Sequence, residues 1–271
     1  IHRWTRSSRH HGIGGQGNCE FPFRIKGKET GTRKRGHDPF LYPCYTPYMA
    51  RQPRVDIAGE IYHVINRANA RWRIFKKPND FVAVLGALEE VLDKFPLDIF
   101  SFCIMPNHWH FAVRPRQDGD IGKFFGKFTQ IVTQRWHAAH RTTGFGHVFQ
   151  GRFKSFLVEQ DSYFLQLMKY IEANPLRAKL VDRAEDWHWG SLYLRTNDIE
   201  RSNTALVPWP VDVPKNYLTL VNQPLPKSNI KRIRHSLLRG SPLGKIFWVE
   251  TMITRHHLEH TLRSPGRPKK D

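Results

Sequence analysis

Within the chain, residues 103–113 are Cys103-Ile104-Met105-Pro106-Asn107-His108-Trp109-His110-Phe111-Ala112-Val113. Side chains alternate across a β-strand, so His108 and His110 are expected on one face while Trp109 and Phe111 lie on the other. Two neutral imidazoles side by side can bind one divalent cation. The alternative is that both histidines are ordinary residues of a half-exposed sheet, because histidine has many structural uses. A second pattern further along the chain favours the metal site.

That second pattern predicts a helix with a tyrosine near its end. Apolar residues at positions 164, 165, 167, 168 and 171 have helical spacing. Asp161 and Ser162 are suitable N-cap residues, and Pro175 disfavours helix beyond Asn174. Tyr170 and Asn174 are four residues apart, which places the hydroxyl and the amide oxygen on one helix face. The amide oxygen is a hard ligand suited to Mg²⁺ or Mn²⁺, although most helical tyrosines only pack.

Taken together, these two features resemble a known family. The histidine–hydrophobic–histidine strand is followed by Gln150-Gly151-Arg152-Phe153 and then by Tyr170-Ile171-Glu172-Ala173-Asn174-Pro175-Leu176-Arg177-Ala178. This order is similar to that of the REP-associated tyrosine transposases, which are single-tyrosine HUH transposases. The resemblance covers roughly residues 50–195, and residues 261–270 also resemble the tail of the longer family members.

The resemblance implies a metal-dependent endonuclease and strand transferase that acts on single-stranded, hairpin-forming palindromic DNA. It implies that His108, His110 and Asn174 hold Mg²⁺ or Mn²⁺ and that Tyr170 forms a 5′-phosphotyrosine. Tyr163, about two helical turns earlier, is the rival nucleophile, but it lacks the tyrosine–isoleucine–x–x–asparagine–proline context. Two alternatives stay open: a non-catalytic hairpin-binding protein on the same fold, and a metal hydrolase that attacks with water.

The charge of the chain agrees with a nucleic-acid partner. Its 271 residues include 43 Lys or Arg and 24 Asp or Glu, a net charge of +19. Residues 1–48 hold nine Lys or Arg and three Asp or Glu, so the remainder still carries +13. DNA binding should therefore weaken steeply with salt. The predicted DNA contacts are Arg67, Arg71, Arg73, Lys123, Lys127, Gln150, Arg152, Lys154, Lys231, Arg232, Arg234 and Arg267.

The order of predicted elements indicates an α+β fold. Strands are expected at 59–66, 97–105, 108–113 and 153–158, and helices at 79–94, at 120–140 and around the tyrosine. This β-α-β-β-α-β order is typical of a ferredoxin-like split βαβ layout. The family resemblance implies the same layout, that of an HUH nuclease domain, here with a small C-terminal helical extension.

Composition divides the chain into five parts. Residues 1–48 lack apolar periodicity and are expected to be a disordered extension or an upstream region, with Met49 as the native start. Residues 49–195 are expected to form the catalytic domain and the proline-rich residues 196–226 a linker. Residues 227–262 are expected to form a helical unit that binds DNA or braces the core, followed by a basic tail at 263–271.

Several classes of protein are disfavoured. The chain has no long apolar run that suits a membrane span or a signal segment, and no phosphate-cradling glycine loop that suggests a nucleotide cofactor. Cys19, Cys44 and Cys103 do not have the spacing of a zinc or redox site. We therefore expect a cytoplasmic, nucleoid-associated protein that is a monomer or a homodimer.

Overall fold

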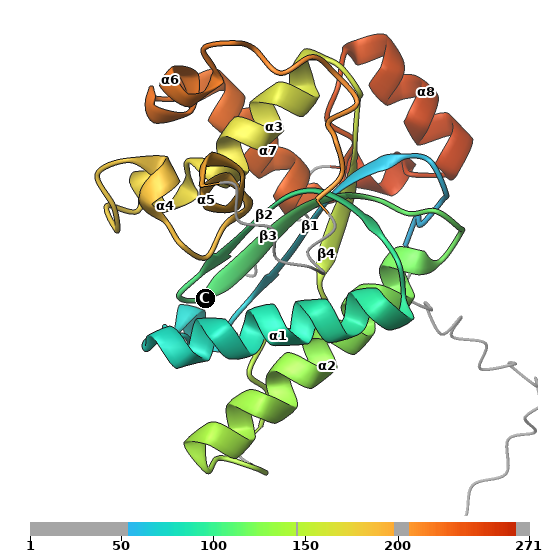
Figure 1. Ribbon diagram of the computed structural model, residues 1–271. Helices are drawn as coiled ribbons and strands as arrows, with labels where there is room; N and C mark the ends of the chain where they lie inside the picture. The colour runs from blue at the N-terminus through green and yellow to red at the C-terminus, as the bar shows by residue number, and fades with distance from the viewer. Residues whose placement is uncertain (1–53, 145, 198–205, 264–271) are drawn as a thin grey trace, which may run out of the picture. The chain divides into compact units, whose positions relative to one another are not determined.

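A four-stranded antiparallel sheet forms the centre of the computed structural model, which describes residues 54–144, 146–197 and 206–263 (Figure 1). The strand order is β2-β3-β1-β4. The strands are β1 (Ile61–Arg67), β2 (Asp98–Met105), β3 (His108–Arg114) and β4 (Lys154–Val158). From β1 to α3 the order of helices and strands is the predicted one, so the α+β fold with a ferredoxin-like sheet is confirmed.

The two faces of the sheet carry different side chains because residues alternate along each strand. Tyr62, Val64 and Phe111 belong to one hydrophobic core, whereas Cys103 and Ala112 belong to a second core on the opposite face. β3 follows β2 through the tight turn at Pro106 and Asn107, and it pairs with β1 on its other edge. The histidine strand is therefore central in the sheet.

Two long helices cover the first face. They are α1 (Pro78–Lys94) and α2 (Asp120–His140), which pack against each other and against Trp109 and Phe111. Both match the predicted ranges, and the N-terminus of α1 is fixed by the Asp80 carboxylate, which accepts hydrogen bonds from the backbone N–H groups of Lys76 and Lys77. In Figure 1 these helices lie below the sheet.

The tyrosine helix covers the opposite face, above the sheet in Figure 1. It is α3 (Ser162–Glu172), and the Asp161 carboxylate caps its N-terminus by accepting a 2.8 Å hydrogen bond from the backbone N–H of Tyr163. The expectation of one helix that runs to Asn174 is wrong. The chain leaves helical geometry at Ala173 and begins a short second helix, α4 (Asn174–Arg177), because Pro175 has no N–H to continue the ladder of α3.

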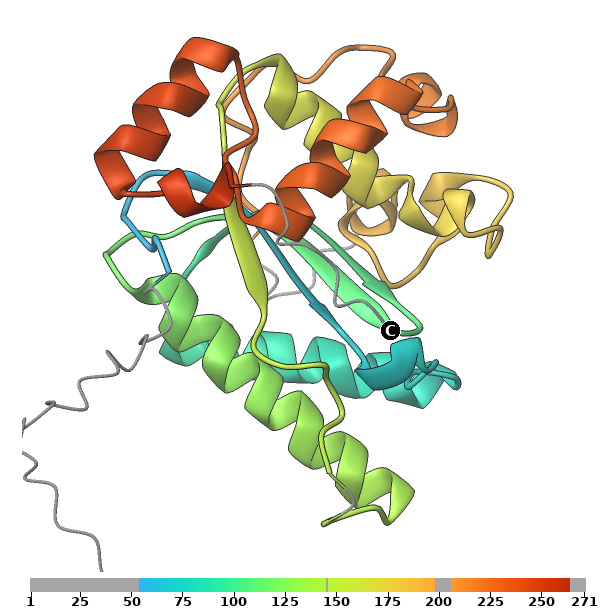
Figure 2. The same cartoon turned by 180° about the vertical axis from the view of Figure 1, so that it is seen from behind.

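The C-terminal residues pack onto both cores. The remaining helices are α5 (Ser191–Thr196), α6 (Tyr217–Asn222), α7 (Lys227–Arg239) and α8 (Ile246–His256), with short 3-10 turns η1 (Asn69–Arg71), η2 (Ala184–Asp186) and η3 (Glu259–Thr261). Ile233 of α7 belongs to the core beneath α3, and Met252 and Ile253 of α8 belong to the other core. Figure 2 shows α7 and α8 beside β4 from behind.

Both edges of the sheet are also covered. Leu206 forms a parallel bridge with Ile99 at the β2 edge, and Leu243 forms one with Val158 at the β4 edge. In its described part, the expected linker at 196–226 contains helix α6 and contacts the sheet. Its tyrosine is buried in the second core, and its tryptophan packs against that core. The domain boundaries at 195 and 226 stay predictions, and residues 1–48 lie outside the described residues.

Within the described parts of the chain, no helix combines the length and the hydropathy that a bilayer-spanning segment requires.

Candidate active site

Three histidines meet on the sheet face beneath α3. His108 and His110 lie on β3, with ring centroids 4.8 Å apart, as their alternate positions predict. The third, His63, comes from β1, and its ring stacks on His110 with centroids 5.0 Å apart. Nε2 of His63 and Nδ1 of His110 are 2.9 Å apart, a hydrogen-bond distance. A pair of histidines predicted from the sequence is therefore a cluster of three.

Burial keeps these imidazoles neutral. It lowers the pKa of His63 and of His108 to about 3, and the pKa of His110 well below its ordinary value. The positive charges of Arg67 and Arg177 lower the pKa of His108 and His110 further. Neutral imidazole is the form that binds a metal ion, so the site is prepared for a cation at neutral pH.

The hydrogen bonds of the histidines leave ligand atoms available. Nδ1 of His108 lies 2.6 Å from the Asn107 side-chain oxygen, which assigns the proton to Nδ1 and leaves the lone pair on Nε2. If Nδ1 of His110 donates to His63, its Nε2 is also free, an arrangement common for metal-bound histidines. The Asn174 amide nitrogen is 3.3 Å from Nε2 of His108, so α4 brings a third polar side chain to the same place.

This donor set fits a divalent cation. The described residues contain no group of three or more His, Cys, Asp or Glu arranged to hold a metal ion. The set at β3 instead combines two neutral imidazoles with an amide, whose oxygen becomes a ligand when the amide group rotates. His108, His110 and Asn174 are therefore the residues of this face that would hold a metal, as the family resemblance implies.

Tyr170 lies directly above the histidines. Its ring is edge-on to His110, with centroids 5.9 Å apart, and to His63 at 6.5 Å. The side chain is buried, and its other neighbour is the guanidinium of Arg177, whose Cζ is 4.3 Å from the centre of the tyrosine ring. Tyr170 and Asn174 thus reach one histidine cluster from two helices, Tyr170 beside His110 and His63, and Asn174 beside His108.

Tyr163 has a different environment. It lies near the beginning of α3, and its hydroxyl accepts a 3.0 Å hydrogen bond from Arg232 of α7. Its ring is partly buried, and no ring contact joins it to the histidines in the described part of the chain. The geometry therefore favours Tyr170 over Tyr163 as the residue that acts with the histidine cluster.

Several predicted DNA contacts lie at the histidine end of the sheet. Arg67 ends β1 and pairs with His108 in the register of the sheet. Arg71 and Arg73 follow in an exposed loop, which is tied to the β2–β3 turn by a 2.8 Å hydrogen bond from the backbone N–H of Ala68 to the Asn107 carbonyl oxygen. Gln150 donates its backbone N–H to the Arg67 carbonyl oxygen at 2.9 Å. The loop before β4 therefore lies beside the same strand end and carries Arg152, and β4 begins with Lys154.

The other predicted contacts are distributed elsewhere. Lys231, Arg232 and Arg234 lie exposed on α7, which packs beside α3 and β4. Lys123 and Lys127 lie on α2, on the sheet face opposite Tyr170, where they contact Asp120 and Gln130. The structure does not bring these two lysines to the histidine cluster. Arg267 lies outside the described residues.

A buried carboxylate anchors the end of α3. Glu172 accepts hydrogen bonds from Ser101, Ser191 and Arg195 on one oxygen, and from the Tyr217 hydroxyl at 2.7 Å on the other. Burial, reinforced by this carboxylate, raises the pKa of Tyr217 well above its ordinary value, so the hydroxyl stays protonated and donates. The network joins α3 to β2, α5 and α6 two residues after Tyr170.

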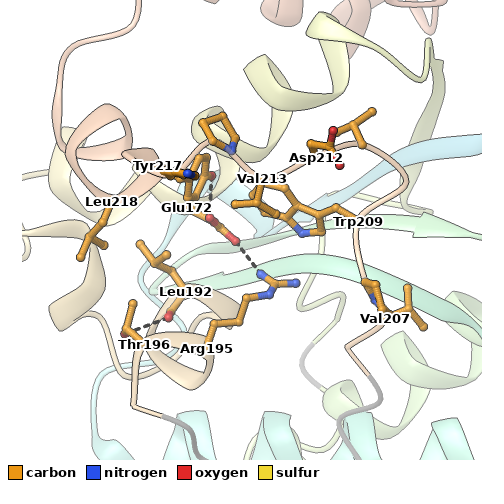
Figure 3. Close-up of a pocket in the computed structure, with 14 residues that line it drawn as sticks. Glu172, Leu192, Arg195, Thr196, Val207, Trp209, Asp212, Val213, Tyr217 and Leu218 are labelled. Carbon is orange, nitrogen blue, oxygen red and sulfur yellow. Dashed lines mark hydrogen bonds and ion pairs between the residues drawn. The ribbon is translucent and has the colours of Figure 1, made fainter.

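This network forms one wall of an open pocket of about 570 Å³. Figure 3 shows Glu172 between Arg195 and Tyr217, with Trp209 across the opening. Neither Tyr170 nor the histidines are among the residues that line it. The pocket is therefore separate from the histidine cluster.

Replacing Glu172 should destabilise the fold. Glu172→Ala leaves Arg195 and Tyr217 without their buried partner, and we expect the free energy of unfolding to fall by about 3 kcal/mol. Urea unfolding followed by circular dichroism measures this change. Glu90→Ala is the matched control, because Glu90 forms partly exposed ion pairs with Lys94 and Arg135 that contribute below about 1 kcal/mol. Equal losses in the two variants would contradict the account.

Acid should destabilise the protein through its neutral histidines. An unfolded histidine takes up a proton near its ordinary pKa of 6.5, whereas His63 in the folded protein does so only at about 3. Its contribution to stability is complete above pH 6.5 and is lost as the pH falls towards 3, by about 1.4 kcal/mol per pH unit. Urea unfolding at several pH values should show a shallower acid dependence in His63→Leu than in the parent. Identical dependences would show that His63 is not held neutral.

Sequence reasoning missed three residues of this site. His63 lies on a predicted strand, but only the pairing of β1 with β3 places it beside His110, and the sequence does not show that pairing. Arg177 was visible only as part of the tyrosine motif, and Glu172 only as a polar residue in an apolar helix. A charged residue among apolar helix positions was the one signal that pointed to a buried network.

Part of the chain matches a known protein family. The family model described as "Transposase IS200 like" matches residues 58–174, which include the histidine cluster, Tyr170 and Asn174. Among solved structures, a REP-associated tyrosine transposase bound to a REP hairpin is 20% identical, with 62% of this chain and 94% of that chain covered and a TM-score of 0.45. A putative transposase from Deinococcus radiodurans R1 is 16% identical, with 45% and 95% covered and a TM-score of 0.33. No curated protein matches the chain.

Proposed function

Because residues 58–174 match the model of the IS200-like transposases, we propose that the protein is a metal-dependent single-stranded DNA endonuclease and strand transferase. Its substrate is DNA with hairpin-forming palindromic repeats, which it cleaves in the cytoplasm. One observation carries the proposal: Tyr170 stands over His110, 5.9 Å from it between ring centres, while Asn174 reaches His108. A nucleophile and three ligand side chains thus share one face of the sheet.

In the proposed reaction, the Tyr170 hydroxyl oxygen attacks the phosphorus of one DNA phosphodiester. The bond to the 3′ oxygen breaks, and that oxygen leaves as a hydroxyl after a proton moves to it from the phenol through solvent. The 5′ side of the DNA stays bound to Tyr170 as a phosphotyrosine. A second 3′-hydroxyl reverses the step and joins a new strand, since the covalent bond retains the phosphodiester's energy.

The family generally uses a divalent metal, and His108, His110 and Asn174 would hold it. When bound, Mg²⁺ or Mn²⁺ supplies positive charge to the phosphate oxygens on which negative charge builds. The protein's own part is to keep the imidazoles neutral and to orient them. His63 contributes to that orientation through its hydrogen-bond contact with His110.

The DNA strand is proposed to pass the histidine end of the sheet. Arg67, Arg71, Arg73, Gln150 and Arg152 gather there, and their cations and amide suit phosphate oxygens. Trp72 lies in the same loop with 71% of its surface exposed, between two arginines. An exposed aromatic ring beside cations suits an unpaired base, because every base can stack on it.

Trp72 therefore gives a prediction for DNA binding. We expect Trp72→Ala to weaken binding of a hairpin with a single-stranded extension by about 1–3 kcal/mol, and to leave binding of the bare hairpin unchanged. Fluorescence anisotropy in EDTA measures both affinities without cleavage. Phe247→Ala removes another exposed ring, on α8, and should change neither affinity. An equal loss for the two oligonucleotides would show that Trp72 does not stack on an unpaired base.

The proposal itself is tested by a cleavage assay. Single-stranded DNA that carries a palindromic repeat from beside the gene is labelled and incubated with the protein, with and without Mg²⁺. A denaturing protein gel should show label attached to the chain only with the metal. Hairpin binding without an adduct would instead support a non-catalytic DNA-binding protein, and cleavage without an adduct would support a hydrolase that uses water.

A further inference from the structure

Arg177 carries a partly buried charge that no described residue neutralises. Its Cζ lies 4.3 Å from the centre of the Tyr170 ring, and its Nη1 is buried without a hydrogen-bond partner. No carboxylate among the described residues lies within ion-pair distance of it. Buried guanidinium groups are normally paired, because removal of the charge from water is costly. An unused donor against the nucleophile therefore needs a partner other than those that the described residues supply.

Two further arginines lie on neighbouring elements, Arg67 at the end of β1 and Arg234 on α7, which packs beside α3. Burial, followed by the positive charges of Arg71 and Arg234, lowers the pKa of Arg67. Burial lowers the pKa of Arg177 as well, and the charge of Arg234 adds to this effect. Arg67 and Arg234 also have no carboxylate within ion-pair distance in the described parts of the chain. We call Arg67, Arg177 and Arg234 the arginine cluster.

The arginine cluster joins three different elements around the nucleophile. Arg67 ends β1 opposite His108, Arg177 ends α4, and Arg234 lies on α7. The positive charge of Arg234 acts against those of both Arg67 and Arg177, so bringing these residues together costs folding free energy unless an anion binds among them. A phosphate group suits this place, because the planar fork of a guanidinium binds two phosphate oxygens at once.

The geometry points to a phosphate-binding site in which Arg177, with Arg67 and Arg234, receives the phosphodiester that Tyr170 attacks. This inference rests on the proposed function for the identity of that phosphodiester, but its anion chemistry follows from the cluster alone. Arg177 is then a further catalytic residue, since it touches both the nucleophile and the substrate. Stacked on the ring, its guanidinium keeps the phosphate beside the tyrosine and neutralises charge that builds on the phosphate oxygens.

The first test measures binding without chemistry. In EDTA, the affinity for the hairpin oligonucleotide with its single-stranded extension is measured at several salt concentrations. Arg177→Gln should reduce the slope of log affinity against log salt by about 0.7 to 1, the value for one lost phosphate contact. Arg116→Gln is the matched control. Arg116 pairs with Asp98 at the start of β2, at the end of the strand away from the β2–β3 turn, so the salt slope of this variant should equal that of the parent. An unchanged slope in Arg177→Gln would overturn the inference.

The second test measures cleavage. Arg177→Gln should slow formation of the covalent adduct on the order of 100-fold. If the parent forms no adduct while the slope still falls in Arg177→Gln, the proposed function fails and the anion site stands. If both results hold, both proposals stand.

A change in the DNA keeps the protein native and covers the case in which Arg177→Gln does not fold. A neutral methylphosphonate is placed at the linkage where the adduct forms, or at each linkage of the extension in turn when there is no adduct. With the parent protein, one position should lower the salt slope by about 0.7 to 1, and an unchanged slope at every position would overturn the inference. Where Arg177→Gln folds, the neutral linkage at that position should lower its slope no further. If Arg177 only held the Tyr170 ring, the variant's effect on the adduct would be equally large on the neutral and charged linkages, and the inference would be overturned.

Discussion

Tyr170→Phe is expected to abolish the covalent protein–DNA adduct, a loss of at least about 10³-fold, and to leave hairpin affinity within about twofold of the parent. The variant loses only the attacking oxygen. The ring keeps its edge-on contacts with His110 and His63 and its contact with Arg177. Labelled DNA on a denaturing protein gel measures the adduct, and fluorescence anisotropy measures the affinity.

Tyr163→Phe is the matched control for this experiment. It removes a hydroxyl from the same helix, but that hydroxyl contacts Arg232 of α7. Adduct formation should therefore continue close to the parental rate in this variant. Parental adduct formation in Tyr170→Phe, together with its loss in Tyr163→Phe, would move the nucleophile to the start of α3.

The second large effect is expected from the histidine pair. His108→Ala or His110→Ala removes an imidazole that burial holds neutral, and each should reduce metal-dependent cleavage on the order of 1000-fold. Isothermal titration with Mn²⁺ should show a parallel loss of metal affinity. His63→Gln removes the ring that contacts Nδ1 of His110 and therefore acts on the metal only through His110. It should lower the metal affinity by about 10- to 100-fold.

His137→Gln provides the control for the histidine series. His137 lies on α2 on the opposite side of the sheet, where Nδ1 contacts the Thr142 hydroxyl. Both metal affinity and cleavage should match the parent in this variant. A parent protein that cleaves equally well with EDTA and with Mg²⁺ would contradict the assignment of the histidines to a metal.

Much of the fold could be predicted because it depends on local pattern. Residues 120–140 show helical spacing of aromatic and aliphatic side chains, and α2 occupies that range. The alternation at 108–113 likewise predicts a strand and the common face of His108 and His110. These features depend on neighbours within a few residues, so a sequence displays them directly.

The rest depends on contacts between distant segments. His63 reaches His110 through the register of β1 against β3, and Glu172 finds Ser191 and Tyr217 only after α5 and α6 have packed. Arg177 lies against Tyr170 because helix α3 ends before Ala173 and α4 begins directly after it. No periodicity in the sequence encodes such pairings. The separate placement of Lys123 and Lys127 has the same cause, since their helix packs on the other face of the sheet.

The most direct test of Tyr170 as nucleophile is to locate the nucleotide on the protein. Trypsin separates the two candidate tyrosines, because cleavage after Lys154, Lys169 and Arg177 yields the peptides Ser155–Lys169 and Tyr170–Arg177. Mass spectrometry of the digested adduct, with fragmentation to locate the added mass, should find the nucleotide on Tyr170. A nucleotide on Tyr163 within Ser155–Lys169, or cleaved DNA with no modified peptide, would contradict the account.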